Sequence, residues 1–165
     1  MTHLAFVGYP TLNKSDHQWI ESFRARHDPQ ASRIAAHFTL VFPAPLAAGP
    51  VLAHASAVLE GARPIPFVVR RPEPVPDRIG GGSHVFLVPE EGRDEIVALH
   101  DHFLPHITAA GSAAFEECHR LAEELTREHL PVQGVIEGVH LIEVASDTVT
   151  TVRRFALERR APPTD

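Results

Sequence analysis

Short apolar runs that end at proline or glycine recur along the chain and predict strands, and segments with apolar residues at helical spacing lie between them. We expect a helix to begin at Ser15, because Gln18 three residues later completes a capping box. The runs expected as strands are 4–9, 37–42, 65–70, 83–88, 105–108, 132–144 and 148–157. The segments expected as helices are 15–27, about 50–59, 93–103 and 113–129.

The helical spacing also predicts which side chains face the core. The inward positions are Trp19, Ile20 and Phe23 in the first helix, Val51, Leu52, Ala55, Val58 and Leu59 in the second, and Phe115, Cys118, Leu121, Ala122 and Leu125 in the last.

Residues 71–82 interrupt the pattern near the middle of the chain. They contain three prolines at alternate positions, followed by three glycines. Because proline cannot donate a hydrogen bond to a sheet, we predict a loop that joins two lobes, about 1–72 and 83–157, within a single domain 1–165. Each lobe reads strand, helix, strand, helix, strand. This order predicts a pseudo-twofold arrangement with equivalent segments facing each other across a cleft.

Composition adds limits to this picture. The chain has 165 residues, 44% of them hydrophobic and 22% charged, which is typical of a globular domain. Cys118 is the single cysteine, so an internal disulfide is excluded and a reducing, cytoplasmic setting is expected. We predict no signal peptide and no membrane association, since no apolar run approaches the roughly 20 residues needed to span a bilayer. A monomer is expected.

Net charge restricts the partners. The formal charge is −6, which argues against broad binding to long nucleic acid, where clustered cations must replace counterions. A small nucleotide or a short RNA end needs only a local positive pocket and stays open.

Two H-x-T motifs carry the candidate chemistry: His37-Phe38-Thr39 and His106-Ile107-Thr108. Strand side chains alternate, so the histidine and threonine of each motif share one face. Two polar side chains on one face of an apolar strand are costly in a core, and a wet cleft removes that cost. One H-x-T tripeptide alone is common and is usually a surface or hydrogen-bonded histidine. Two copies at matching places in two similar halves favour a site.

Phosphodiester hydrolysis needs groups of this kind. A neutral imidazole can accept a proton from water while a protonated one gives a proton to the departing alkoxide, and neither step requires a metal. Threonine hydroxyls can donate hydrogen bonds to phosphate oxygens as charge builds up in the transition state.

The residues 37–42 and 105–108 resemble the paired signatures of the two-histidine (2H) phosphoesterase superfamily, most closely the bacterial 2′-5′ RNA ligases and the cyclic nucleotide phosphodiesterases. The similarity in element order covers about residues 3–157. It implies a bilobal α+β fold with antiparallel sheets lining a central cleft and helices outside. It also implies metal-independent hydrolysis of 2′,3′-cyclic phosphates, usually to a 2′-phosphate, or cleavage or ligation of 2′-5′ RNA linkages. Carried over by position, His37 and His106 are the catalytic acid and base, and Thr39 and Thr108 bind the phosphate.

The sequence departs from the family pattern after the second motif. Many relatives have an aliphatic and then a basic residue there, whereas Thr108 is followed by Ala109-Ala110-Gly111. Arg70, Arg71 and Arg78, close to the 71–82 loop, are candidates to replace that contact, although a surface role is the commoner one for arginine. The missing basic residue after Thr108 and the acidic net charge together favour a small nucleotide or a short RNA end carrying a cyclic phosphate as the substrate.

Other interpretations remain open. A metal site within His100–His106 is disfavoured because His100 and His102 would lie about 200° apart on a helix, and we expect no metal and no cofactor. A catalytically idle module that binds nucleotides or RNA ends is the main alternative to an enzyme, and a 2′-5′ RNA ligase is the other. Gly80-Gly81-Gly82 lacks the following Lys and Ser/Thr of a nucleotide-triphosphate loop. Cys118 is expected to be a buried packing residue.

Overall fold

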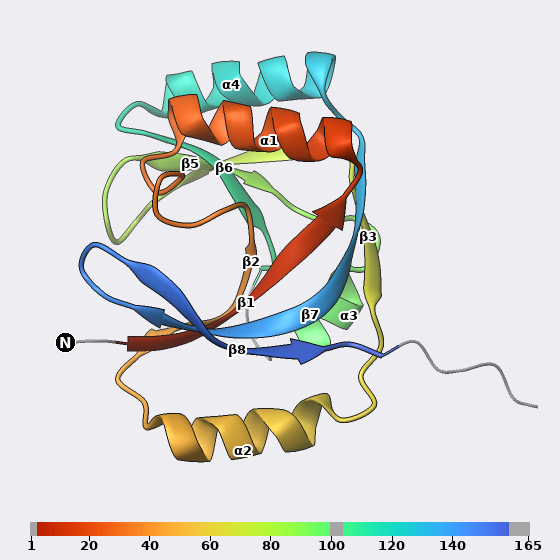
Figure 1. The fold of residues 1–165 in the computed structure, drawn as a ribbon. Coiled ribbons are helices and arrows are strands. Elements are labelled where there is room, and N and C mark those ends of the chain that lie inside the picture. Colours follow the sequence, from red (N-terminus) through yellow and green to blue (C-terminus); the bar gives the residue numbers. More distant parts are fainter. Residues whose placement is uncertain (1–2, 100–103, 159–165) are drawn as a thin grey trace, which may run out of the picture.

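One curled antiparallel sheet of eight strands forms the centre of the part of the chain that the computed structural model describes, residues 3–99 and 104–158 (Figure 1). The helices lie outside this sheet, which confirms the predicted α+β class, with one continuous sheet in place of separate ones. The strands are β1 (His3–Leu12), β2 (Phe38–Ala44), β3 (Ile65–Val69), β4 (Pro72–Pro76), β5 (Ser83–Leu87), β6 (Ile107–Ser112), β7 (Val132–Val144) and β8 (Val149–Ala156). The helices are α1 (Lys14–His27), α2 (Ala48–Leu59), α3 (Arg93–Ala98) and α4 (Phe115–Glu128).

The order of the strands is similar on the two sides of the β2–β6 pair, although β3 and β8 extend one side only. It runs β3-β7-β1-β2-β6-β5-β4, with β8 also paired to β7. The pair β2–β6 is therefore flanked by β1 on one side and by β5 on the other, as a pseudo-twofold axis between β2 and β6 requires. The two sequence halves are interleaved: β7 pairs with β1, and α1 packs against β6.

The predicted loop over 71–82 is wrong for residues 72–76, which form β4 at one edge of the sheet. The amide of Asp77 donates to the carbonyl of Gly82 (3.0 Å), so the amides at odd positions point toward β5. The prolines occupy the even positions and turn their missing N–H groups away from the partner strand. Alternate prolines are thus compatible with an edge strand, and the loop shrinks to the turn after it.

The glycines that follow belong to this turn. Gly82 has φ +83°, and a Cβ there would lie 2.7 Å from the carbonyl oxygen of Ser112. Only glycine fits this combination of positive φ and close backbone approach.

The ends of several elements differ from the prediction. The N-cap of α1 is Asn13 and not Ser15, since the Asn13 side chain accepts the amide of Asp16 at 2.8 Å. β1 and β2 run through Pro10 and Pro43, which were expected to stop them; the β1–β7 register shifts between Gly8 and Pro10. α3 ends at Ala98, and the remaining predicted turn, 100–103, lies outside the described residues.

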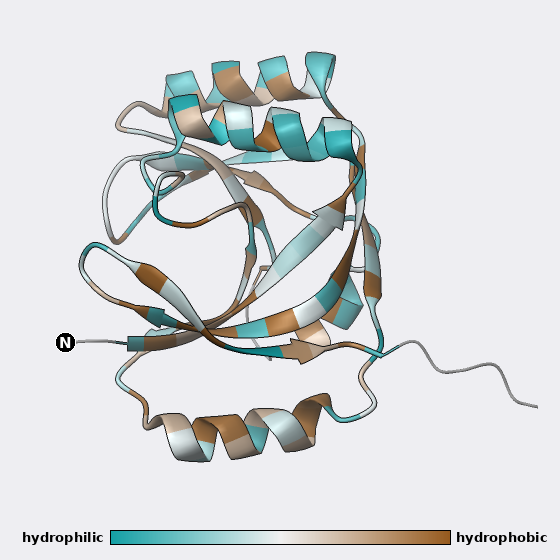
Figure 2. Ribbon diagram, in the orientation of Figure 1, coloured by the Kyte–Doolittle hydropathy of each residue, from teal (hydrophilic) through white to brown (hydrophobic). Residues whose placement is uncertain are grey.

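The core confirms most of the predicted inward positions. Ile20, Phe23 and Ala55 are buried, as are Cys118, Leu121, Ala122 and Leu125. The prediction is wrong for Val58 and Phe115, whose surfaces are 56% and 38% exposed. Figure 2 shows that α1 and α4 carry mostly hydrophilic residues, so each of these helices buries only a narrow stripe. Among the described residues, no helix is long and apolar enough to cross a membrane.

Candidate active site

The two H-x-T motifs meet at the centre of the sheet. Phe38 of β2 pairs with Ile107 of β6 in antiparallel register, and both side chains are buried. One step along each strand from this pair, His37 is across from Thr108 and Thr39 is across from His106. Because side chains alternate, these four residues share the face opposite to Phe38 and Ile107. The predicted juxtaposition thus follows from a single cross-strand pair.

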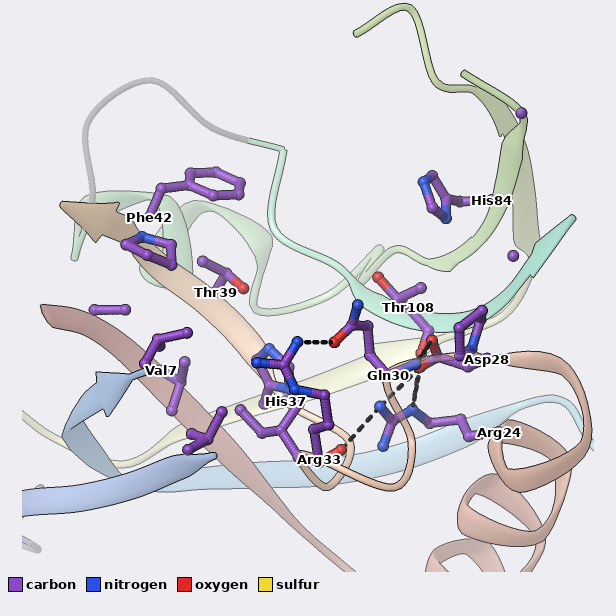
Figure 3. A pocket seen from close by; sticks show the side chains of 18 of the residues that line it. Val7, Arg24, Asp28, Gln30, Arg33, His37, Thr39, Phe42, His84 and Thr108 are labelled. Carbon is purple, nitrogen blue, oxygen red and sulfur yellow. Dashed lines mark hydrogen bonds and ion pairs between the residues drawn. The ribbon is translucent and has the colours of Figure 1, made fainter. Parts of the chain in front are cut away.

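A cavity of about 750 Å³ opens on this face. His37, Thr39 and Thr108 line it (Figure 3). His106 is not one of the lining residues, but it lies close enough to His37 for the charge of one ring to act on the other. The structure gathers the four residues at one place, and their roles in catalysis stay a prediction.

Both imidazoles are held in the same way. His37 Nδ1 lies 2.8 Å from the carbonyl oxygen of Ala35, and His106 Nδ1 lies 2.8 Å from that of Leu104. A carbonyl only accepts, so Nδ1 carries the hydrogen in each ring. This fixes Nε2 as the nitrogen that gains or loses a proton. The ring of Phe86 stacks on His106 with 3.7 Å between centroids.

The surroundings keep both histidines neutral. Burial lowers the pKa of His37 below the ordinary 6.5; Arg24 lowers this pKa further, whereas the bond to Ala35 and the charges of Asp28 and Glu21 raise it. Burial likewise lowers the pKa of His106, whereas the hydrogen bond to the Leu104 carbonyl raises it. At pH 7 both imidazoles are therefore mostly uncharged, ready to accept a proton.

The threonines offer unused hydroxyls. Over residues 3–99 and 104–158, neither the Thr39 nor the Thr108 hydroxyl has a hydrogen-bond partner. Both line the cavity beside the imidazoles, so each hydroxyl is available to donate to an anion bound there.

The walls of the cavity differ in character. One wall is apolar and comes from β1, β7 and the start of β8, through Ala5, Val7, Ile142, Val144 and Val149. The opposite wall is polar and includes Ser83, His84 and Ser112. A ligand with one apolar and one polar part matches this division.

Two arginines line the cavity, and they differ in how their charge is balanced. Arg24 is 1% exposed and bonds to the carboxylates of Asp28 and Glu21. Arg33 donates instead to the Ala145 carbonyl (2.8 Å) and to the Gln30 side chain (3.2 Å), both uncharged. Its buried Nε has no acceptor within the described residues. Arg33 is thus the uncompensated cation beside His37 (Figure 3).

The sequence interpretation missed these groups. The candidates Arg70 and Arg71 form exposed ion pairs with Glu90 and Glu91, and neither they nor Arg78 line the cavity. The burial of Arg24 could have been predicted from the sequence, because Arg24 follows the inward-facing Ile20 at a spacing of four residues on the helix. Arg33 carried no such signal, since it lies in a loop.

His84 was also missed as a cavity residue. It sits on β5, with Nε2 3.4 Å from the Asp77 carboxylate. Alternation along 83–88 placed it on the same face as Phe86, but nothing in the sequence showed that this face meets the motifs.

The metal interpretation concerns residues that are only partly described. His100, Asp101 and His102 lie outside the described residues. In the remainder of the chain no group of three or more His, Cys, Asp or Glu side chains is arranged to hold a metal ion.

Two H-x-T motifs facing one cavity from the centre of a curled antiparallel sheet are the arrangement implied by a two-histidine phosphoesterase. The family model of the 2′-5′ RNA ligase superfamily matches residues 12–148. The chain therefore belongs to this superfamily, whose members are phosphoesterases and ligases, and the resemblance found in the sequence is confirmed. No curated protein matches the sequence.

Solved structures show the same fold. E. coli LigT complexed with 3′-AMP has a TM-score of 0.56 at 19% identity, covering 96% of this chain and 99% of LigT. LigT complexed with ATP has a TM-score of 0.58 at 18% identity, covering 96% and 98%. A crystal structure described as a phosphoesterase has a TM-score of 0.56 at 18% identity, covering 96% and 100%.

Proposed function

We propose that this protein is a metal-independent phosphodiesterase that hydrolyses 2′,3′-cyclic phosphates of nucleotides or short RNA ends. The observation that carries the proposal is the Phe38–Ile107 pair, which sets two histidines and two threonines on one face of the sheet, where His37, Thr39 and Thr108 line a single cavity. Membership of the 2′-5′ RNA ligase superfamily supports the same chemistry.

Hydrolysis needs the two rings in opposite protonation states, one neutral and one protonated, and the negative charge of a bound phosphate favours the proton on one of them. The neutral imidazole of one histidine takes a proton from water as the water oxygen bonds to phosphorus. The bond from phosphorus to O3′ breaks, and the other histidine, protonated on Nε2, gives its proton to O3′, which leaves a 2′-phosphate. The Thr39 and Thr108 hydroxyls donate to the non-bridging oxygens, whose charge grows in the transition state. Solvent then restores both rings.

The walls of the cavity fit a small nucleotide. Its phosphate lies among the motifs and near Arg33, the uncompensated cation, and its apolar base packs on the wall formed by Ala5, Val7 and Ile142. The similar LigT structures hold 3′-AMP and ATP, which supports a nucleotide as the ligand of this cavity.

The deciding experiment is an assay of 2′,3′-cyclic nucleotides with the metal-free protein in excess chelator. We expect one phosphomonoester, the 2′-phosphate, to appear at the same rate with and without chelator, because His37 and His106 supply both proton transfers. Nucleotide binding without product over hours would contradict the proposal and favour a binding module. Joining of 2′-5′ RNA ends in the absence of cyclic phosphate opening would favour a ligase.

Arg33 is expected to govern substrate affinity. Arg33→Met removes a charge-assisted contact to phosphate, so KM for the cyclic nucleotide should rise about tenfold or more while kcat changes less. Arg71→Met is the matched control, because Arg71 is 79% exposed in its side chain and lies outside the cavity. An unchanged KM in a folded Arg33→Met protein would show that Arg33 does not bind the substrate.

A further inference from the structure

Arg24 links both motif segments through one buried guanidinium. Its Nε is shared between Asp28 Oδ2 (3.0 Å) and the main-chain oxygen of Thr108 (3.1 Å), inside the second motif. Its Nη2 donates to Asp28 Oδ2 (2.8 Å) and to the carbonyl of Ile34 (3.0 Å), three residues before His37.

A second path runs through Glu21, one turn earlier on α1. Arg24 Nη1 donates to Glu21 Oε2 (3.2 Å), and the other carboxylate oxygen of Glu21 accepts the amide of Ala36 at 2.7 Å. Ala36 directly precedes His37. Asp28 in turn accepts the amide of Gln30 (2.9 Å), which anchors the start of the loop that leads to the first motif.

These bonds reach both sides of the pseudo-twofold axis. The β2–β6 ladder joins the motifs only through Phe38 and Ile107, and Arg24 adds ties from α1 to each of them. A planar fork with five N–H donors in fixed directions suits this task, and a lysine ammonium on a flexible stem does not.

We propose that Arg24 is a positioning residue that holds the His37 and His106 segments at their working separation. It acts through the main chain of the second motif and of the loop just before the first motif, with its own charge balanced by Asp28 and Glu21, and not by touching the substrate. Since small displacements of reacting groups lower rates strongly, the residue is required for turnover more than for binding.

Arg24 also acts on His37 electrically. The charged and titratable groups around His37 are Arg24, Glu21 and Asp28 from α1 and its end, Arg33 from the loop, Tyr9 from β1 and His106 beside β6. Arg24 lowers the pKa of His37, whereas Glu21 and Asp28 raise it. Loss of the arginine charge therefore shifts the titration of His37 to higher pH.

The test compares Arg24→Lys and Arg24→Met with Arg26→Lys and Arg26→Met. Arg26 is an exposed arginine on the same helix. Arg24→Lys keeps the charge against Asp28 and Glu21, so it decides the question if Arg24→Met fails to fold. We expect Arg24→Lys to lower kcat for a 2′,3′-cyclic nucleotide about tenfold to a hundredfold with KM within about threefold, and both Arg26 variants to keep wild-type values.

Two further measurements need no turnover. The amide resonances of Thr39 and Thr108 in the ligand-free protein should shift in Arg24→Lys and Arg24→Met but not in the Arg26 variants, and the His37 ring should titrate at higher pH in Arg24→Met. The inference rests on the proposed function only for kcat. A wild type without hydrolysis, but with these two shifts, would sink the proposed function and leave the positioning role standing. Folded Arg24 variants with wild-type amide resonances of Thr39 and Thr108 and wild-type His37 titration would overturn it.

Discussion

Replacing His37 or His106 with alanine is expected to lower kcat for a 2′,3′-cyclic nucleotide by at least about a hundredfold, the usual effect of losing a general acid or base. Each ring is held by a carbonyl on Nδ1, so Nε2 is the nitrogen that exchanges the proton. Steady-state kinetics at pH 7 measure the effect.

His119 provides the matched control for this pair. It is an exposed histidine on α4, away from the cavity, so His119→Ala should keep wild-type activity. Thermal unfolding of all three variants separates lost chemistry from lost fold. Full activity in folded His37→Ala or His106→Ala would disprove the acid–base assignment.

The second large effect is expected from the threonine hydroxyls. Thr39→Val and Thr108→Val keep the β-branched shape that suits a strand and remove one donor each. If the hydroxyls bond phosphate oxygens as charge develops, each change should lower kcat by up to about a hundredfold. The double variant should be slower than either single variant, since the two threonines approach the cavity from different strands.

Thr150 serves as the comparison for the threonine series. It is an exposed strand residue on β8 that does not line the cavity. Thr150→Val should leave kcat and KM unchanged. If Thr39→Val and Thr108→Val behave like Thr150→Val, the phosphate is held by other groups, with Arg33 the first to examine.

The sequence alone supported the H-x-T pairing because that arrangement depends on local rules. Strand alternation placed His37 with Thr39, and His106 with Thr108, and the repeated element order predicted that they face one another. The positions of α1 and α4 that are both predicted to face the core and buried in the structure followed from helical spacing in the same way. The structure brings these residues together as expected.

Features that depend on long-range neighbours were out of reach. Arg24 is buried because Asp28, the Thr108 carbonyl and the Ile34 carbonyl converge on it, and only the first of these partners is near in sequence. Arg33 lines the cavity because the β7–β8 turn presents the Ala145 carbonyl to it. The alternate prolines of 72–76 predict a loop, because the local sequence does not show whether a strand lies at the edge or in the interior of a sheet.

The edge formed by β4 has a consequence for how molecules of this protein meet one another. An unpaired outer strand normally offers alternating donors and acceptors, and a strand of a second molecule can join it and start aggregation. On the outer side of β4 the donor positions are occupied by Pro72, Pro74 and Pro76. An incoming strand would find acceptors without donors, so the sheet ends at β4 and edge-to-edge association at this border is blocked.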